Sequence, residues 1–327
     1  MKHLAFATGV FVSAAGIAAA ETPELVVYTY DSFVSEWGPG PQIEAAFEEV
    51  CGCDLKFVAA GDGAGLLSRL RLEGARTEAD IVLGLDTNLT AAAKETGLFA
   101  PHSVSAEYSL PVDWADDFFV PYDWGYFAFV HQAEFDAPVS FKALAGSDAR
   151  ILIQDPRSST PGLGLLMWVK AAYGEEAPAI WEGLADNIVT VTKGWSEAYG
   201  LFLEGEADMV LSYTTSLAYH MIAEDDHGKK AALFEEGHYL QVEVAGKLAG
   251  SDVPELADSF LEFMVTDAFQ SVIPTTNWMY PAVTPEAGLP EGFESLVQPE
   301  KALLLSADEA AEIRAEALEE WRAALSQ

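Results

Sequence analysis

One local pattern repeats along this sequence and limits the folds that it can adopt. A short run of β-branched and aromatic residues is followed by a polar or aromatic turn and then by a helical stripe of apolar residues. Strands are expected at residues 25–28, 55–59 and 80–84, with helices at 42–50, 66–73 and 89–96, and further strands at 149–154, 188–191 and 207–212. Strands that alternate with helices predict mostly parallel sheets with helices on both faces.

Two longer extended segments are expected to pass between the two halves. Residues 118–130 are too long and too aromatic for a simple edge strand, and residues 239–245 alternate clearly between apolar and polar side chains. We therefore expect an α/β protein of two lobes with a ligand cleft between them. The expected division is a signal peptide at 1–20, lobe 1 at 21–121, lobe 2 at 122–240, and a return to lobe 1 at 241–327.

Two helices are expected in the last part of the chain. Residues 254–269 carry an apolar stripe at helical spacing, which predicts one amphipathic helix. Ser306 and Glu309 have the spacing of a capping box and predict the start of the final helix.

The first twenty residues have the features of a secretory signal peptide. Lys2 precedes an apolar stretch, and three alanines at 18–20 fit a cleavage site. No later run of about 18 apolar residues predicts a membrane span. We therefore expect an exported and soluble protein. It is also expected to be a monomer.

The chain is strongly acidic. Its formal charge is −35, and removal of Lys2 with the signal leaves 16 basic and 52 acidic residues, a charge of −36. Nucleic acids and anionic lipid surfaces would be repelled by such a protein. A small cationic ligand would be attracted, although an adaptation for solubility or salt also explains most of the acidity.

The two cysteines, Cys51 and Cys53, are separated by one glycine. In an oxidising compartment they are expected to form a disulfide, which closes too small a loop to add much stability. Two ligands with no nearby histidine make a poor metal site, so no metal is expected there. A redox role for this pair stays open.

Candidate ligand-binding residues follow the expected strands of both halves. In open α/β sheets, ligands sit beyond the carboxyl ends of the strands. The residues placed there are Tyr30, Trp37, Asp62, Ser159, Thr160, Trp195, Tyr213, Ser216, Tyr219 and Trp278. Aromatic rings combined with an acid suit a flat cation, through stacking and cation–π attraction.

Two of these positions have a plain structural alternative. Asp62 lies in a loop with the spacing G-x-G-x-G, which does not match the dinucleotide fingerprint, and this aspartate could instead cap the next helix. Thr160 is expected as the N-cap of a helix with Pro161 at its first position. Three hydroxyl residues in a row at 158–160 exceed what capping requires and favour an anion site.

Several long blocks of the chain resemble the family of thiamine-binding periplasmic proteins of bacterial ABC importers. The blocks are residues 28–41, 154–164, 193–200, 211–216 and 277–281, together with the Cys-Gly-Cys segment. The resemblance implies a type 2 periplasmic-binding-protein fold, an importer permease as partner, no cofactor, and thiamine or its mono- and diphosphate as ligand. It places binding residues at Asp62, Gly63, Ser159, Thr160, Trp195, Tyr213, Thr214, Thr215 and Ser216, with Tyr30, Trp37, Tyr219 and Trp278 as the remaining aromatic wall.

The resemblance also implies roles and leaves alternatives. Aromatic rings would enclose the two heterocycles, Asp62 would accept from the aminopyrimidine or balance the cation, and the hydroxyls would hold the hydroxyethyl or phosphate end. Ferric ion or a polyamine, bound by the same fold, is the alternative. No G-x-S-x-G or H-E-x-x-H motif predicts an enzyme.

Overall fold

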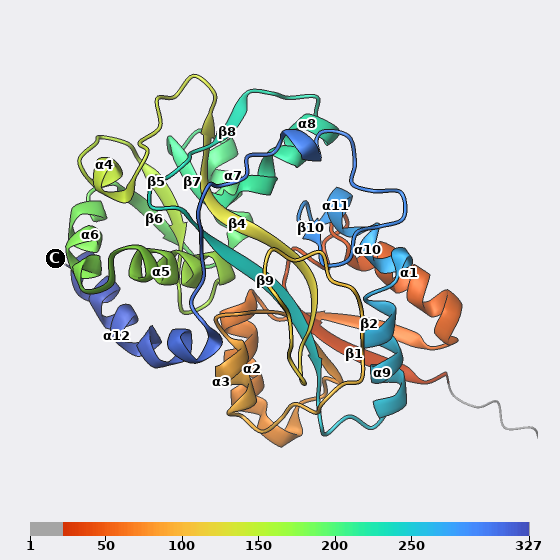
Figure 1. Ribbon diagram of the computed structural model, residues 1–327. Helices are drawn as coiled ribbons and strands as arrows, with labels where there is room; N and C mark the ends of the chain where they lie inside the picture. The colour runs from red at the N-terminus through yellow and green to blue at the C-terminus, as the bar shows by residue number, and fades with distance from the viewer. Residues whose placement is uncertain (1–21, 327) are drawn as a thin grey trace, which may run out of the picture.

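Two long strands pass through both lobes of the molecule. The computed structural model describes residues 22–326, so the predicted signal peptide lies outside the described residues. Strands β4 (Val120–Gln132) and β9 (His238–Lys247) run antiparallel through the middle of the molecule (Figure 1). They confirm the two predicted crossing segments. The predicted lobe boundaries at residues 121 and 240 both fall inside these shared strands.

The first lobe is built from three strand–helix units. They are β1 (Glu24–Thr29), α1 (Gly40–Cys51), β2 (Asp54–Ala59), α2 (Gly63–Glu73), β3 (Ile81–Asp86) and α3 (Thr90–Lys94), with a 3-10 turn η1 (Gly74–Arg76) after α2. Strand β1 is parallel to both β2 and β3, as predicted, and β3 is antiparallel to β9. The sheet is therefore parallel within the lobe and becomes mixed where the crossing strands join it.

The second lobe repeats this plan on the other side of β4. Its elements are α4 (Phe141–Ala145), β5 (Ile151–Gln154), α5 (Thr160–Tyr173), η2 (Gly174–Glu176), α6 (Ala177–Leu184), β6 (Ile188–Thr192), α7 (Trp195–Leu203), β7 (Met209–Tyr213), η3 (Thr214–Ser216), α8 (Leu217–Ala223) and β8 (Lys229–Ala231). Strand β5 is parallel to β6 and β7, whereas β7 is antiparallel to β4. One sheet path, β2-β1-β3-β9-β4-β7-β5-β6, thus links both lobes.

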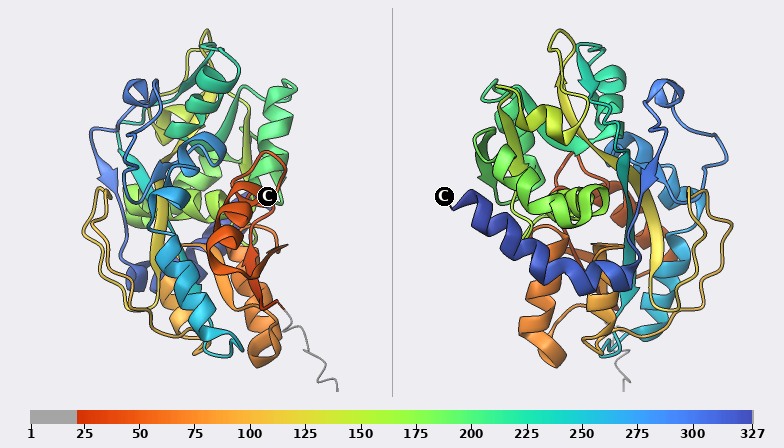
Figure 2. Two further views of the ribbon diagram at one scale, coloured as in Figure 1. Left: turned by 90° about the vertical axis from the view of Figure 1, so that its right-hand side faces the viewer. Right: turned by 60° about the vertical axis from the view of Figure 1, so that its left-hand side comes forward.

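The chain after β9 contacts both lobes. It forms α9 (Pro254–Phe263), α10 (Asp267–Gln270), α11 (Ile273–Thr276), β10 (Tyr280–Pro281), η4 (Phe293–Ser295), β11 (Ala302–Leu303) and α12 (Ala307–Leu325). Helix α9 packs on α1 and β9, while α12 packs on α5 and α6 and also reaches α3 (Figure 2). The predicted capping box is present, because Ser306 and Glu309 bond each other's backbone at the start of α12.

The single helix predicted for residues 254–269 is wrong. Helix α9 ends at Phe263, and α10 begins at Asp267. Between them the backbone of Thr266 is extended, with φ −85° and ψ 161°, and its hydroxyl donates to the carbonyl of Phe263. A threonine hydroxyl that bonds the preceding turn competes with helix continuation, which the apolar periodicity alone does not reveal.

Aromatic side chains fill the core of each lobe. In the first lobe, Phe47 and Phe260 meet edge to face with centroids 5.0 Å apart. In the second lobe, Trp168 and Phe141 meet in the same way at 4.8 Å. The indole N–H of the buried Trp168 donates to the carbonyl of Gly237, so this ring is buried without an unpaired donor.

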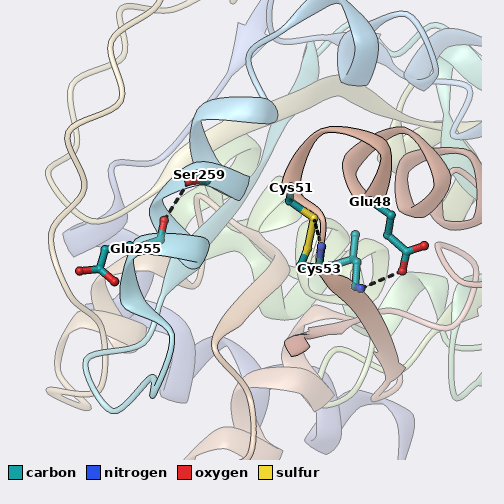
Figure 3. Close-up of a disulfide and its surroundings, with 6 residues drawn as sticks. Glu48, Cys51, Cys53, Glu255 and Ser259 are labelled. Carbon is teal, nitrogen blue, oxygen red and sulfur yellow. Dashed lines mark hydrogen bonds between the residues drawn. A yellow bond between two sulfur atoms is a disulfide. The ribbon is translucent and has the colours of Figure 1, made fainter. Parts of the chain in front are cut away.

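A disulfide joins Cys51 and Cys53 at the end of α1, where the sequence predicts one (Figure 3). Its neighbourhood is held by Glu48, whose carboxylate accepts from the backbone N–H of Leu55 at 2.9 Å. Neither cysteine lines the cavity described below. The bridge therefore links the last residue of α1 to the turn before β2, and it lies apart from the candidate site.

Candidate functional site

A cavity of about 550 Å³ lies where segments of both lobes meet. The loop after β1, the starts of α2, α5 and α7, the end of β7 and the segment after α11 all contribute to it. Its lining consists of Tyr30, Ser32, Trp37, Asp62, Thr160, Pro161, Trp195, Ser196, Tyr199, Gly200, Leu203, Tyr213, Ser216, Tyr219, Ala223, Gln241, Glu243, Asn277, Trp278 and Met279. The cavity thus lies beyond the carboxyl ends of strands, where α/β sheets bind ligands.

The structure brings most of the predicted residues together around this cavity. Those that line it are Tyr30, Trp37, Asp62, Thr160, Trp195, Tyr213, Ser216, Tyr219 and Trp278. Gly63, Ser159, Thr214 and Thr215 do not line it. The hydroxyl of Thr215 is directed instead to the sulfur of Met279, and Thr214 is fully buried.

Asp62 links the two lobes and does not cap its own helix. Its carboxylate accepts from the hydroxyl of Ser159 at 2.8 Å and from the backbone N–H of Trp195 at 3.3 Å, and both donors belong to the second lobe. No capping bond to α2 is present. Burial raises the pKa of Asp62 to about 6, although these two hydrogen bonds oppose the shift.

Two predicted ligand-binding hydroxyls serve the same contact between lobes. The hydroxyl of Thr160 accepts from the backbone N–H of Gly63 at 3.0 Å, and Ser159 donates to Asp62. The N-cap of α5 is Ser159, one residue earlier than predicted. The hydroxyl of Ser159 therefore already donates to a residue of the other lobe.

Aromatic rings from both lobes form the walls of the cavity. Trp195 stacks on Tyr199 with centroids 5.0 Å apart, and its indole N–H donates to Ser212 at 2.8 Å. Trp37 of the first lobe lies 6.5 Å from Trp195 and is 54% exposed, so it stands at the mouth. A ring at the mouth that remains half exposed can change position when a ligand enters.

Two aromatic side chains owe their position to unusual backbone. Trp278 has a φ of +57°, a left-handed conformation that L residues with bulky side chains rarely adopt. Its ring lies edge to face with Tyr219 at 5.5 Å. The ring of Tyr30 packs directly on Gly84, where a Cβ would come within 2.4 Å of the ring. Strained positions of this kind cluster at binding sites.

Sequence reasoning missed the polar residues that β9 contributes and two neighbours of the predicted Trp278. Gln241 and Glu243 lie two residues apart on β9, so both point to the cavity face of the strand. Asn277 and Met279 come from the turn next to Trp278. The available signal was the pair of polar residues at alternate positions inside the predicted crossing segment 239–245.

Glu243 belongs to a buried cluster of acids and phenols. Its carboxylate accepts from Tyr122 at 2.6 Å and from Tyr30 at 3.1 Å, and Asp123 lies directly opposite on β4. Asn277 donates to Asp123 at 2.6 Å. Burial raises the pKa of both carboxyls, and the charge of Glu243 raises the pKa of Asp123 further. The two buried carboxyls therefore resist being ionised at the same time.

The charges around the cavity are of one sign. Within residues 22–326, no lysine, arginine or histidine lines it, whereas Asp62 and Glu243 both do. Seven of its lining side chains are tyrosine or tryptophan. This combination suits a flat ring that carries positive charge and hydrogen-bonding groups.

Comparisons with known proteins identify the family of this chain. Residues 38–271 match the family of bacterial extracellular solute-binding proteins. The chain belongs to this family. A thiamine-binding periplasmic protein of Escherichia coli (strain K12) is 55% identical over 309 residues, which cover 93% of this chain and 94% of that relative. A solved periplasmic thiamin binding protein superposes with a TM-score of 0.92 at 53% identity, covering 95% of this chain and 98% of that one.

The solute-binding family confirms the predicted type of fold and the periplasmic location. The relatives at 41–55% identity over most of the chain all carry the name thiamine-binding periplasmic protein, as the sequence resemblance predicted. A ferric binding protein from Campylobacter jejuni has a TM-score of 0.74 but is 19% identical, so it shares the fold alone.

A possible metal-ligand group in this solute-binding protein lies beside the cavity. His220, Glu224 and Asp226 could place three ligand atoms together. His220 is already bonded on both sides, to Glu224 at 2.7 Å and to the hydroxyl of Tyr199 at 2.8 Å, while Asp226 pairs with Lys229. These contacts make a hydrogen-bonded support for the wall residue Tyr199.

None of the helices between residues 22 and 326 has the length and apolar character to cross a bilayer.

Proposed function

We propose that this protein captures thiamine and its phosphate esters in the periplasm and delivers them to the permease of an ABC importer. The observation that carries the proposal is a cavity with seven aromatic residues and two carboxylates and, among residues 22–326, no basic side chain. A thiazolium ring has a fixed positive charge and a flat face, and both are attracted by such walls. The high identity to proteins named for thiamine binding supports the same ligand.

The lining suggests how the ligand is held. Tyr219, Trp278 and Trp37 enclose the rings, and Asp62 balances the cation from the side of α2. Ser216 and Tyr213 also line the cavity and are neutral groups available for a hydroxyethyl or phosphate end. The protein works as a monomer, needs no cofactor and does not alter its ligand.

The cavity favours neither alternative ligand. A ferric site needs tyrosinate ligands, but burial and nearby carboxylates raise the pKa of Tyr213 well above its ordinary value, and its hydroxyl donates to Gln241. A polyamine has no ring to stack between the aromatic walls. Thiamine fits the cavity better than either for these two reasons.

Titration calorimetry tests the proposal directly. Thiamine, thiamine monophosphate and thiamine diphosphate are each titrated into protein that has been unfolded and refolded to remove retained ligand, with spermidine and ferric citrate as comparison ligands. We expect saturable heat with the thiamine compounds only. Absence of heat with all three would overturn the proposal, and phosphate release from the diphosphate would contradict a purely binding role.

A further inference from the structure

An unpaired hydrogen-bond donor lies in the part of the cavity formed by β9. Gln241 is fully buried and lines the cavity. Its side-chain oxygen accepts from the hydroxyl of Tyr213 at 2.9 Å, but its Nε2 has no partner among the described residues. Buried donors without a partner are rare because they lose their hydrogen bonds to water. A donor of this kind that faces a cavity indicates an acceptor on the ligand.

A fixed acceptor lies next to that donor. Glu243 is the next residue on the same face of β9 and also lines the cavity. Two phenols, Tyr30 and Tyr122, donate to one of its oxygens, and so the carboxylate cannot rotate freely. A carboxylate has about four acceptor sites, so the glutamate can still accept from a ligand.

We propose that Gln241 and Glu243, here called the β9 floor, recognise the aminopyrimidine ring of thiamine. Gln241 Nε2 donates to a ring nitrogen, and Glu243 accepts from the exocyclic amine. The inference rests on the proposed function and deepens it, because it assigns the amine to a residue other than Asp62. The carboxylate of Asp62 already accepts two hydrogen bonds from the second lobe and is left with the role of counter-charge.

Oxythiamine provides a matched probe of this floor. In this compound an oxo group replaces the exocyclic amine, so a donor becomes an acceptor and one pyrimidine nitrogen gains a proton, while the cationic thiazolium ring is unchanged. Facing Glu243, the oxo group would meet a carboxylate, and we expect the wild-type protein to bind oxythiamine at least about tenfold more weakly than thiamine. In Glu243→Gln the new amide can donate to the oxo group, so the ratio of the two dissociation constants is expected to fall well below that of the wild type.

Asp62→Asn is the control variant. It removes a negative charge from the same cavity and should weaken thiamine and oxythiamine by the same factor, which leaves their ratio as in the wild type. A wild-type ratio in Glu243→Gln, or a ratio that changes in Asp62→Asn instead, overturns the assignment. Failure of the wild-type protein to bind thiamine at all would overturn the proposed function, which is a different result.

Gln241→Leu provides a second test that does not disturb the acid cluster. Leucine has a similar volume and removes the unpaired donor. We expect thiamine to bind at least about tenfold more weakly, because a ring nitrogen then loses its donor, and we expect a lower Tm for the ligand-free protein, because the hydroxyl of Tyr213 loses its acceptor. A purely structural role for Gln241 predicts the lower Tm with unchanged affinity for thiamine, and unchanged affinity would overturn the β9 floor.

Discussion

Asp62 carries a buried charge whose effect on stability depends on pH. Burial raises the pKa of this residue to about 6, whereas an aspartate in the unfolded chain titrates near 4. Between these values the folded protein retains a proton that the unfolded chain releases. The ionised carboxylate therefore lowers the free energy of unfolding, and this penalty grows from about pH 4 and is complete above about pH 6.

Asp62→Asn is expected to stabilise the ligand-free protein at neutral pH. A shift of about 2 units corresponds to a gain of up to about 3 kcal/mol at pH 7.5, with little change below about pH 4. Urea denaturation at several pH values measures the difference between variant and wild type. A gain that is equal at every pH would contradict this account of the charge.

Trp278 combines a ligand-facing ring with a backbone that glycine would prefer. Its φ of +57° disfavours any residue with a Cβ, at a cost of about 1–2 kcal/mol. Trp278→Ala and Trp278→Gly both remove the ring and should weaken thiamine binding about tenfold. The glycine variant should be the more stable of the two by about 1 kcal/mol in chemical denaturation, because only glycine adopts this left-handed φ without the steric strain that a Cβ causes. Equal stability of the two variants would argue against strain at this residue.

At the scale of elements, the starts of α2 and α5 meet so closely that only glycine fits. A Cβ on Gly63 would lie 2.6 Å from the carbonyl oxygen of Gly84 and 2.7 Å from the hydroxyl of Thr160. Two residues later, a Cβ on Gly65 would come no closer than 3.4 Å to the carbonyl of Ser158, an ordinary contact. Both glycines are in the first turn of α2, so the same substitution has different consequences at the two positions.

Gly63→Ala is expected to weaken thiamine binding at least about tenfold, because the added methyl group separates the two helix starts that flank Asp62. Gly65→Ala should bind thiamine as the wild type does and have a higher Tm, since alanine favours a helix by up to about 1 kcal/mol over glycine. Calorimetry and thermal denaturation of both variants measure these effects. Wild-type affinity in Gly63→Ala would show that the close approach is not needed for binding.

At the scale of the whole molecule, negative charge and a cationic ligand predict salt-sensitive association. After removal of the signal peptide the formal charge is −36, from 16 basic and 52 acidic residues. The Debye length falls from about 30 Å at 0.01 M salt to about 3 Å at 1 M, so long-range attraction is lost as salt is added. Stopped-flow tryptophan fluorescence should show a several-fold slower association with thiamine at high salt. Sucrose at matched viscosity is the control. An association rate that is independent of salt would contradict long-range electrostatic attraction of the ligand.

The local pattern of the sequence was sufficient for the elements and for the outer part of the site. Strands and helices follow from side-chain periodicity, and residues such as Tyr30 and Trp195 could be placed at the cavity because they follow strands. Residues inside a crossing strand, such as Gln241 and Glu243, could not be placed at the cavity from the sequence. A polar residue in such a strand has many explanations until its neighbours in space are known. The break between α9 and α10 at Thr266 was also not predicted, because it depends on one hydrogen bond, from the hydroxyl of Thr266 to the carbonyl of Phe263.

The sequence by itself thus determined a two-lobed α/β protein, its family and the class of ligand, because these depend on local patterns and long stretches of similarity. Only the tertiary structure decided how individual groups are used. Asp62 and Ser159 are 97 residues apart, yet their side chains form a hydrogen bond between the lobes, and Asp62 makes no side-chain cap bond to α2. Hydrogen bonds between distant residues depend on how the lobes pack, and no local pattern contains that information.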